Sequence, residues 1–270
     1  MTTHAPAVAA PRVDTGHRLT FFRAVRSEGI KLATLRSTWW SIAIAAVLTI
    51  GIASLIAQAV DLPGFDPIRA VVMPIQFTML LAGIIGAIAV TGEYSTGMIR
   101  STLTAVPLRG TVLLAKSLVL AIFLFVSSLV IFGVAAVAVG AIVGGRDQSI
   151  DWSDPSASLL PIVVASLSMS VFALIGVSFG FILRSGAGAI AATVGLLFVL
   201  PIVANFFAMA GEAWAWVVDT AAYLPVAAAQ SAILPGEGAA LDAPVAFLTL
   251  GCWVVAGLLA AWAVLRSRDA

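Results

Sequence analysis

The stretch from Thr91 to Lys116, TGEYSTGMIRSTLTAVPLRGTVLLAK, is a polar interval between two long apolar runs. Within it, Ile99, Leu103 and Val106 have the spacing of one face of a short helix. Pro107 blocks continuation of that helix, because its ring clashes with the preceding turn and it has no N–H to donate. The stretch therefore predicts a short amphipathic helix held between two apolar segments, a shape that can receive force from a soluble partner. An ordinary surface loop is the alternative.

The composition of the whole chain indicates what the flanking segments are. Of its 270 residues, 61% are hydrophobic and only 10% are charged, and the mean hydropathy is +1.10. Soluble globular chains carry roughly 45–50% apolar and ~25% charged residues, so a soluble domain could not bury this much apolar side chain. The chain is therefore predicted to be an integral membrane protein. Its single cysteine, Cys252, excludes an intrachain disulfide.

Six apolar runs are long enough to cross a bilayer, since a helix needs ~20 residues to span ~30 Å of hydrocarbon. They lie at about 39–60, 70–90, 113–143, 158–183, 189–209 and 244–265. We expect an all-α integral membrane fold in which residues 38–270 form one domain of six transmembrane helices. The second of these helices should be kinked at Pro74. Asp66 and Asp154 should each cap a helix whose first residue is the proline that follows.

Two further patterns concern helix packing and the last long interval between apolar runs. Gly176 and Gly180 in the fourth run form a face of small residues for close helix approach, and Gly140 and Gly144 repeat this pattern in the third run. Residues 210–243 are too apolar for a free loop and too broken by prolines for a crossing. We therefore expect two short helical pieces in that interval.

In front of the first apolar run, the sequence indicates a tail and an amphipathic helix. Residues 1–17 are rich in Ala, Pro and Thr and are predicted to be disordered. Residues 18–37, RLTFFRAVRSEGIKLATLRS, combine an apolar stripe with basic residues that include Lys31 and Arg36, which predicts a helix in the headgroup plane. Glu28 falls near the apolar stripe of this helix. It either pairs with a basic residue of the 91–116 stretch or is a solvated side chain at the helix edge.

The distribution of basic residues predicts the orientation of the chain. Only Arg69 and Arg146 fall on one side of the predicted spans. The other basic residues fall on the opposite side: Arg12, Arg18, Arg23, Arg26, Lys31, Arg36, Arg100, Arg109, Lys116, Arg184, Arg266 and Arg268. The positive-inside rule therefore predicts that both termini and the 91–116 stretch are cytoplasmic in this multi-pass protein.

The chemistry of the spans argues against several classes of membrane protein. No apolar run has an ionisable residue near its centre, where one costs ~2.5–3.5 kcal/mol. This argues against a proton-driven pump, an intramembrane protease and a voltage sensor. Gln58, Gln76 and Asn205 could line a path, although interhelical hydrogen bonding is the commoner role for such groups.

Motifs for phosphate, metal or covalent chemistry are also missing from the sequence. The string GEYSTGMI has glycines at the spacing of a phosphate loop, but Met98 and Ile99 stand where Lys and Ser or Thr are needed. We find no metal-ligand cluster, catalytic triad or haem motif. The chain is therefore not expected to be an enzyme, to hold a metal or to bind a cofactor, and energy for any work should come from another chain.

Two stretches and the overall layout resemble the permease subunits of bacterial ABC transporters of the type-2, exporter-like class. The stretches are SEGIKLATLRSTWW (27–40) and TGEYSTGMIRSTLTAVPLRGTVLLAK (91–116). The resemblance covers nearly the whole chain, because the six spans, the amphipathic helix in front and the 210–243 interval also match the family layout. It implies that the 91–116 stretch contains a cytoplasmic coupling helix that docks on a separate nucleotide-binding ATPase subunit. The residues expected to take part are Glu93, Gly97, Arg100, Leu103, Pro107 and Arg109.

The resemblance also implies partners and a mechanism. Two permease chains would assemble with two ATPase chains, which bind ATP and Mg²⁺, and no nucleic acid is expected. Lys116 matches a basic residue at the start of the third span, whereas Met98 stands where family members often have Thr. Glu93 would stiffen the lever by pairing with Arg100 or with arginines of the front helix; otherwise it caps the loop helix at its positive end.

The substrate expected from the apolar spans is hydrophobic or amphipathic. Two other functions stay open at this point. One is a non-transporting scaffold or signalling component that keeps the permease fold. The other is a secondary transporter built on inverted repeats, which ranks last because the chain has no convincing internal repeat and no ion-binding carboxylate in its spans.

Overall fold

The computed structural model of the chain describes residues 20–60, 65–105, 108–146, 148–236 and 238–267. Every regular element in these ranges is helical. The predicted disordered tail at 1–17, together with Arg18 and Pro107, lies outside the described residues.

Six helical segments are long and apolar enough to cross a membrane, which makes the chain an all-α, multi-pass membrane protein. These spans are α2 (Arg36–Ala59), α3 with α4 (Pro67–Val72 and Ile75–Ser95), α6 (Arg109–Val143), α7 (Leu159–Leu183), α8 with the π-helical η1 and α9 (Gly186–Val194, Gly195–Val199 and Leu200–Ala208), and α12 (Ala243–Ser267). The short elements are α1 (Phe21–Thr34), α5 (Met98–Ala105), the 3-10 helix η2 (Glu212–Trp214), α10 (Ala215–Ala221) and α11 (Pro225–Ile233). All six apolar runs predicted from the sequence are confirmed.

The helix α7 is the centre of the bundle. In its most apolar stretch 78% of the residues are buried, against 17–28% for four of the other five spans. It crosses α4 at glycines: a Cβ added to Gly176 would lie 1.9 Å from the Gly83 carbonyl oxygen, and one added to Gly86 would lie 2.1 Å from the Ala173 oxygen. The small-residue face predicted in the fourth run is confirmed, because only glycine permits this backbone approach.

The matching prediction for Gly140 and Gly144 is wrong. A Cβ on Gly140 would meet nothing closer than the Ile150 Cδ1 atom at 3.9 Å, and the atom nearest to one on Gly144 belongs to its own helix. Among the described residues neither glycine lies against the backbone of a second helix, so the close helix approach expected there is not found.

The helix ends largely follow the local signals. The Asp66 Oδ1 atom accepts a hydrogen bond from the Ile68 N–H at 3.0 Å, which confirms the cap before Pro67. The second span is broken between α3 and α4 at Pro74, as predicted. Asp154 instead stabilises a turn by accepting from the Ser156 N–H, and α7 begins only at Leu159, so Asp154 does not cap a helix that starts at the next proline.

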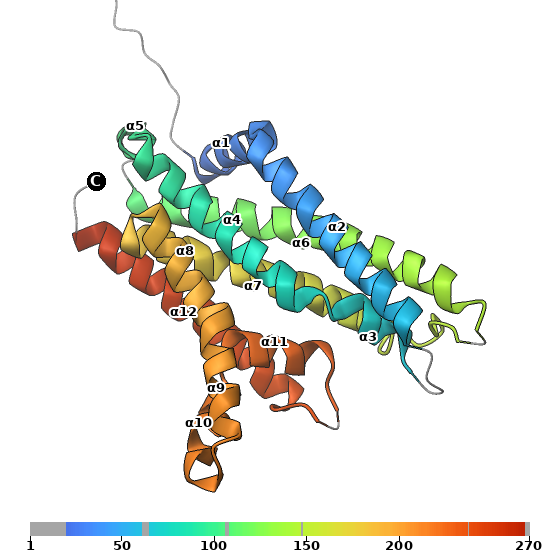
Figure 1. The fold of residues 1–270 in the computed structure, drawn as a ribbon. Helices are drawn as coiled ribbons and strands as arrows, with labels where there is room; N and C mark the ends of the chain where they lie inside the picture. The colour runs from blue at the N-terminus through green and yellow to red at the C-terminus, as the bar shows by residue number, and fades with distance from the viewer. Residues whose placement is uncertain (1–19, 61–64, 106–107, 147, 237, 268–270) are drawn as a thin grey trace, which may run out of the picture.

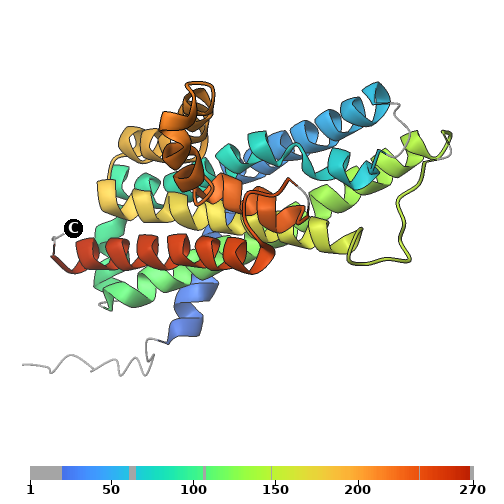
Figure 2. The ribbon, with the colours of Figure 1, turned by 90° about the horizontal axis from the view of Figure 1, so that it is seen from below.

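The two ends of the bundle differ in charge. One end of the bundle carries α1, α5 and one terminus of each of the six spans, and it is called the basic end below (Figure 1). Arg100, Arg109, Lys116, Arg184 and Arg266 belong to this end. The region 210–243 forms the two predicted short helices, α10 and α11, with η2 before them. The arm made of α9, η2 and α10 diverges from the bundle (Figures 1 and 2). It leaves just after the π-helical turn η1, an irregularity that often accompanies a bend in a helix.

Candidate functional site

Four charged side chains meet at the basic end and are called the ion cluster below: Glu28, Lys31, Glu93 and Lys116. The Lys116 Nζ atom lies 2.6 Å from Glu28 Oε2 and 2.9 Å from Glu93 Oε1. The Lys31 Nζ atom lies 2.8 Å from Glu28 Oε1 and 2.8 Å from Glu93 Oε1. Each ammonium therefore bridges both carboxylates, and the cluster ties together α1, α4 and α6.

The ion cluster is buried rather than solvated. Glu28, Glu93 and Lys116 are only 6%, 4% and 5% exposed, and the side chain of Lys31 is 28% exposed. Burying charges is costly unless they are paired and hydrogen-bonded. The Glu93 Oε2 atom is nevertheless buried without a hydrogen-bond partner among the described residues.

The helix α1 docks through this charged face. Glu28 and Lys31 are three positions apart and therefore lie on one side of the helix. Glu28 is the buried residue of α1, whereas Phe21, Phe22 and Leu35 are exposed. Of the expected apolar stripe, Leu32 packs against the core of the bundle, whereas Phe21 and Leu35 are exposed.

The structure decides between the alternatives that the sequence left open for the two glutamates. Glu28 pairs with Lys116, which confirms a partner in the 91–116 stretch and excludes the solvated alternative. Glu93 lies within α4 and pairs with Lys31 and Lys116, so the expected pairing with Arg100 or with arginines of the front helix is wrong. Nor does it cap α5. Sequence analysis noted Lys116 as a basic residue at the start of the third span but did not count it among the site residues.

Gly97 accounts for the position of Arg100. Its φ of +71° is in the left-handed region that favours glycine, and its N–H donates to the Tyr94 carbonyl oxygen at 3.2 Å, so the chain turns after α4. This turn carries α5 away from α4 and leaves the Arg100 side chain exposed. Arg100 is consequently available to solvent and not to Glu93.

The short helix predicted in the 91–116 stretch is α5. Ile99 is buried and Leu103 is half-buried, whereas Met98, Ser101 and Thr104 are exposed. This helix is amphipathic and presents a polar surface at the basic end of the bundle.

Arg109 and Arg36, two other predicted site residues, also lie at the basic end. The Arg109 Nη1 atom donates to the Leu265 carbonyl oxygen at 2.6 Å, near the end of α12, where a cation is favourable for the helix dipole. Arg36 is the exposed first residue of α2. Arg109 therefore fastens the start of α6 to α12.

The pKa of Lys31 reflects its place in the ion cluster. Burial on its own would lower the pKa of this ammonium. Hydrogen bonds from Lys31 to Glu28 and Glu93, together with the charges of these carboxylates, raise its pKa above the ordinary value of 10.5. Lys31 therefore carries its charge throughout the neutral range.

A cavity of about 490 Å³ adjoins the ion cluster and is called the α2–α4 groove below. It lies between α1, α2, α4 and α6, with the cluster itself in its wall. Apolar side chains line the rest, including Leu81, Ile85 and Ile88 of α4 and Leu120 of α6. The groove thus joins a charged region to an apolar one.

The three residues predicted to line a path do not all lie together. Gln76 and Asn205 share a cavity of about 510 Å³ between α4, α9, α10 and α11. Gln230 of α11 lines the same cavity and was missed, although it is an amide in a segment of otherwise small apolar residues. Gln58 lies elsewhere, at the end of α2, where its carbonyl oxygen accepts from the Arg146 guanidinium at 3.3 Å.

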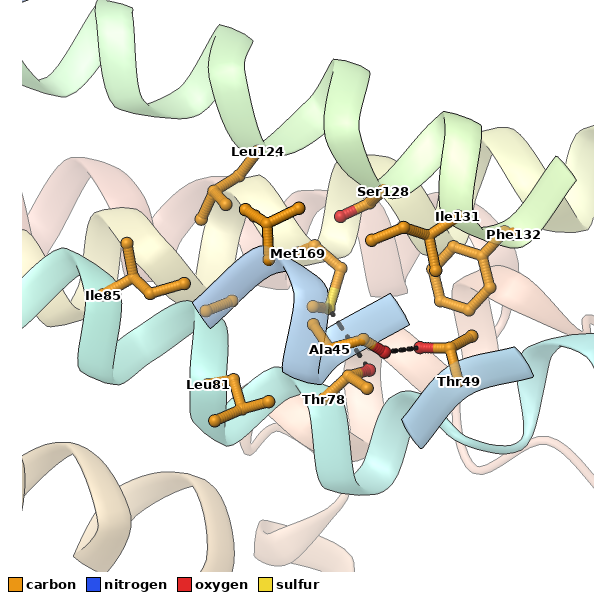
Figure 3. A pocket seen from close by; sticks show the side chains of 12 residues that line it. Ala45, Thr49, Thr78, Leu81, Ile85, Leu124, Ser128, Ile131, Phe132 and Met169 are labelled. Atoms are coloured by element: carbon orange, nitrogen blue, oxygen red, sulfur yellow. Dashed lines mark hydrogen bonds between the residues drawn. The ribbon is translucent and has the colours of Figure 1, made fainter. Parts of the chain in front are cut away.

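A much smaller cavity lies inside the bundle between α2, α4, α6 and α7 (Figure 3). Its volume is about 10 Å³, close to the least that a single water molecule needs. The Thr49 hydroxyl donates to the Ala45 carbonyl oxygen at 2.8 Å and the Thr78 hydroxyl to the Met169 sulfur at 3.8 Å, so these groups already have partners (Figure 3). This cavity is a packing feature and not a binding site.

The chain was also compared with known proteins. No protein-family model matches it, and no curated protein sequence does.

Proposed function

We propose that this chain is the permease subunit of an ATP-driven transporter of the type-2 ABC class, moved by a separate ATPase subunit. The observation that carries the proposal is the ion cluster, which joins α1 and α6 to the last turns of α4, directly before the exposed helix α5. This is the arrangement a lever needs. A displacement of α5 would move α4, and the ion pairs would carry that movement into α1 and α6.

The distribution of basic residues between the two ends of the bundle supports the placement of this lever in the cytoplasm. Arg100, Arg109, Lys116, Arg184 and Arg266 belong to the basic end, which the positive-inside rule assigns to the cytoplasmic face of the bacterial inner membrane. In this orientation α1 is a cytoplasmic amphipathic helix and both termini are inside. The residues of α5, which include Leu103 and follow the turn at Gly97, would then face a soluble ATPase.

The proposed assembly has two permease chains, of one or two kinds, and two ATPase chains in a lipid bilayer. ATP and Mg²⁺ would bind the ATPase subunits. The apolar spans suit a hydrophobic or amphipathic substrate, and the cavity that contains Gln76, Asn205 and Gln230 supplies polar groups toward the end of the bundle opposite to α5.

The proposal is tested by co-expression with a candidate ABC-type ATPase subunit from the same genome and capture of the chain from mild detergent. We expect the ATPase to be retained and its ATP hydrolysis to respond to the permease. Arg100→Glu, on the exposed face of α5, should weaken retention by reversing the charge there. Arg69→Glu, an exposed arginine at the opposite end, is the matched control and should leave retention unchanged.

Glu93→Gln tests the lever itself. It keeps the shape of the side chain but removes one negative charge from the ion cluster. The complex should still assemble, but in proteoliposomes ATP hydrolysis should no longer be coupled to transport. Unchanged coupling in this variant would contradict the lever. Stable retention of the ATPase without any ATP-dependent transport by the wild-type complex would indicate the scaffold function instead.

A further inference from the structure

The α2–α4 groove has the shape and the chemistry of an amphiphile site. Its volume of about 490 Å³ falls within the range of about 300–1,000 Å³ that is typical of small-molecule pockets. Leu81, Ile85 and Ile88 provide an apolar wall, and the ion cluster lies at the end of the groove nearest α5. An alkyl chain would fit the wall and a polar headgroup would fit the charged end.

Hydroxyl groups surround the charged end of the groove. They belong to Thr34, Ser37, Thr38, Ser41, Ser95 and Thr96. Several of these hydroxyls already donate to their own helix: Thr34 to the Ile30 oxygen at 2.8 Å, Ser41 to the Ser37 oxygen at 3.0 Å and Thr96 to the Gly92 oxygen at 2.9 Å. A hydroxyl that donates keeps its acceptor lone pairs. The hydroxyl groups that line the groove can therefore accept hydrogen bonds from N–H or O–H groups of a headgroup.

The ion cluster can bind both a hydrogen-bond acceptor and a hydrogen-bond donor of an occupant of the groove. Its two carboxylates and two ammonium groups sum to no net charge, which does not select for an anionic or a cationic headgroup. Lys31 uses two of its three N–H donors within the cluster and is the most exposed member. The Glu93 Oε2 atom, in contrast, is a buried acceptor without a partner among the described residues. An occupant that carries a phosphate oxygen and an N–H donor would satisfy both.

Among bilayer lipids without net charge, phosphatidylethanolamine combines these features. It has a phosphate and a primary ammonium with N–H donors. Phosphatidylcholine has the same charges but a quaternary ammonium without N–H, and phosphatidylglycerol is anionic without a cation. The backbone N–H groups inside a helix of a second copy are already hydrogen-bonded and could not satisfy Glu93, so such a helix would need a donor side chain at this point.

We propose that the α2–α4 groove binds one molecule of phosphatidylethanolamine, with its phosphate at Lys31, its ammonium at Glu93 and one acyl chain along Leu81, Ile85 and Ile88. The inference concerns binding by this chain alone and does not depend on the ATPase or on transport.

Native mass spectrometry of the full chain in mild detergent tests the inference. The chain is incubated with an equimolar mixture of phosphatidylethanolamine, phosphatidylcholine and phosphatidylglycerol whose acyl chains differ in mass. We expect one tightly retained phosphatidylethanolamine, favoured about tenfold over phosphatidylcholine, because a hydrogen bond to a charged group is lost with the quaternary headgroup.

Two tryptophan variants locate the site. Ile88→Trp fills the groove and should abolish the retained lipid. Ile122→Trp is the matched control, because Ile122 is an isoleucine of similar exposure on α6 that does not line the groove. Glu93→Gln should reduce the preference for phosphatidylethanolamine over phosphatidylcholine to about twofold or less, since the neutral amide makes a weaker hydrogen bond than a carboxylate.

Three results would overturn the inference. The first is equal retention of the three headgroups by the wild-type chain. The second is retention that survives Ile88→Trp. The third is a lipid-free dimer of the chain that Ile88→Trp dissociates while Ile122→Trp does not, which would show that a second copy covers the groove.

Discussion

The Nζ atom of Lys116 lies 2.6 Å from Glu28 Oε2 and so joins two residues that are 88 positions apart in the chain. Both side chains are almost completely buried. The desolvation of a buried pair can exceed its Coulombic gain, so the pair is weak evidence for stability. Its physical consequence is positional, because α1 and α6 cannot separate without leaving a charge unpaired in an apolar region.

Loss of Lys116 should be strongly destabilising. Lys116→Met keeps the length of the side chain but leaves Glu28 and Glu93 with a single shared ammonium, and removal of one partner of a buried pair costs about 3–5 kcal/mol. Thermal unfolding in mild detergent measures the change. Arg100→Met, at an exposed position on α5, should change the free energy of unfolding by less than about 0.5 kcal/mol. Equal effects of the two variants would mean that the ion cluster is not formed in the membrane protein.

The crossing of α4 and α7 should not tolerate a methyl group. In Gly176→Ala the new Cβ would lie 1.9 Å from the Gly83 carbonyl oxygen, so the helices must separate, with a loss of about 1–3 kcal/mol. Gly133→Ala in α6 is the control, because a Cβ there meets nothing within 4 Å. That variant should be neutral or stabilising by up to about 1 kcal/mol. If Gly176→Ala unfolds at the wild-type temperature, the close crossing is wrong.

The raised pKa of Lys31 predicts a loss of stability in alkali. Since the pKa of this ammonium in the folded state exceeds the ordinary value of 10.5, its contribution to stability is complete below that pH. It is lost as the pH rises through the folded-state pKa. Lys31→Arg keeps the charge in this range, because a guanidinium does not deprotonate there. Unfolding of both proteins is compared from pH 8 to about pH 11.5.

The wild-type chain should lose stability relative to Lys31→Arg only above about pH 10.5. Glu28, Glu93 and Lys116 face position 31 in both proteins, so the comparison isolates the change of the side chain at that position. Parallel curves up to the highest pH would show that Lys31 does not depend on its carboxylate partners.

The orientation of the chain is testable with single thiols. In a background in which the exposed Cys252 is replaced by Ser, Thr104→Cys places a thiol on α5 and Ser153→Cys places one at the opposite end, both at exposed positions. A membrane-impermeant maleimide applied to intact cells should label only the Ser153→Cys chain. After permeabilisation it should label both. Labelling of Thr104→Cys from outside would reverse the orientation and remove the proposed contact with a cytosolic ATPase.

Much of the fold could be read from local patterns. The six apolar runs are visible because a membrane requires long uninterrupted apolar segments, and Asp66, Pro67 and Pro74 act through the backbone of their own neighbours. The short helix α5 was equally local, since its apolar spacing lies within one turn or two. The cap expected at Asp154 did not form, because a turn of a few residues satisfied that aspartate first.

Helix packing could be predicted less well from the sequence, because it depends on residues that are far apart in the chain. Gly176 and Gly180 are at the crossing with α4, whereas Gly140 and Gly144 have the same spacing but meet no helix backbone of another described element. The sequence of one helix does not show which other helix packs against it. For the same reason Gln58 lies apart from Gln76 and Asn205, which the diverging α9 brings into one cavity with Gln230.

The sequence by itself determined the membrane class, the number and approximate positions of the spans, and the presence of a short helix between the second and the third span. Each of these follows from hydrophobicity and backbone chemistry over a few turns. Only the tertiary structure decided that Glu93 is bound by Lys31 and Lys116 and that Arg100 turns outward. Those pairings depend on how α1, α4 and α6 converge in space and on the left-handed turn at Gly97, which sets the direction in which the chain leaves α4.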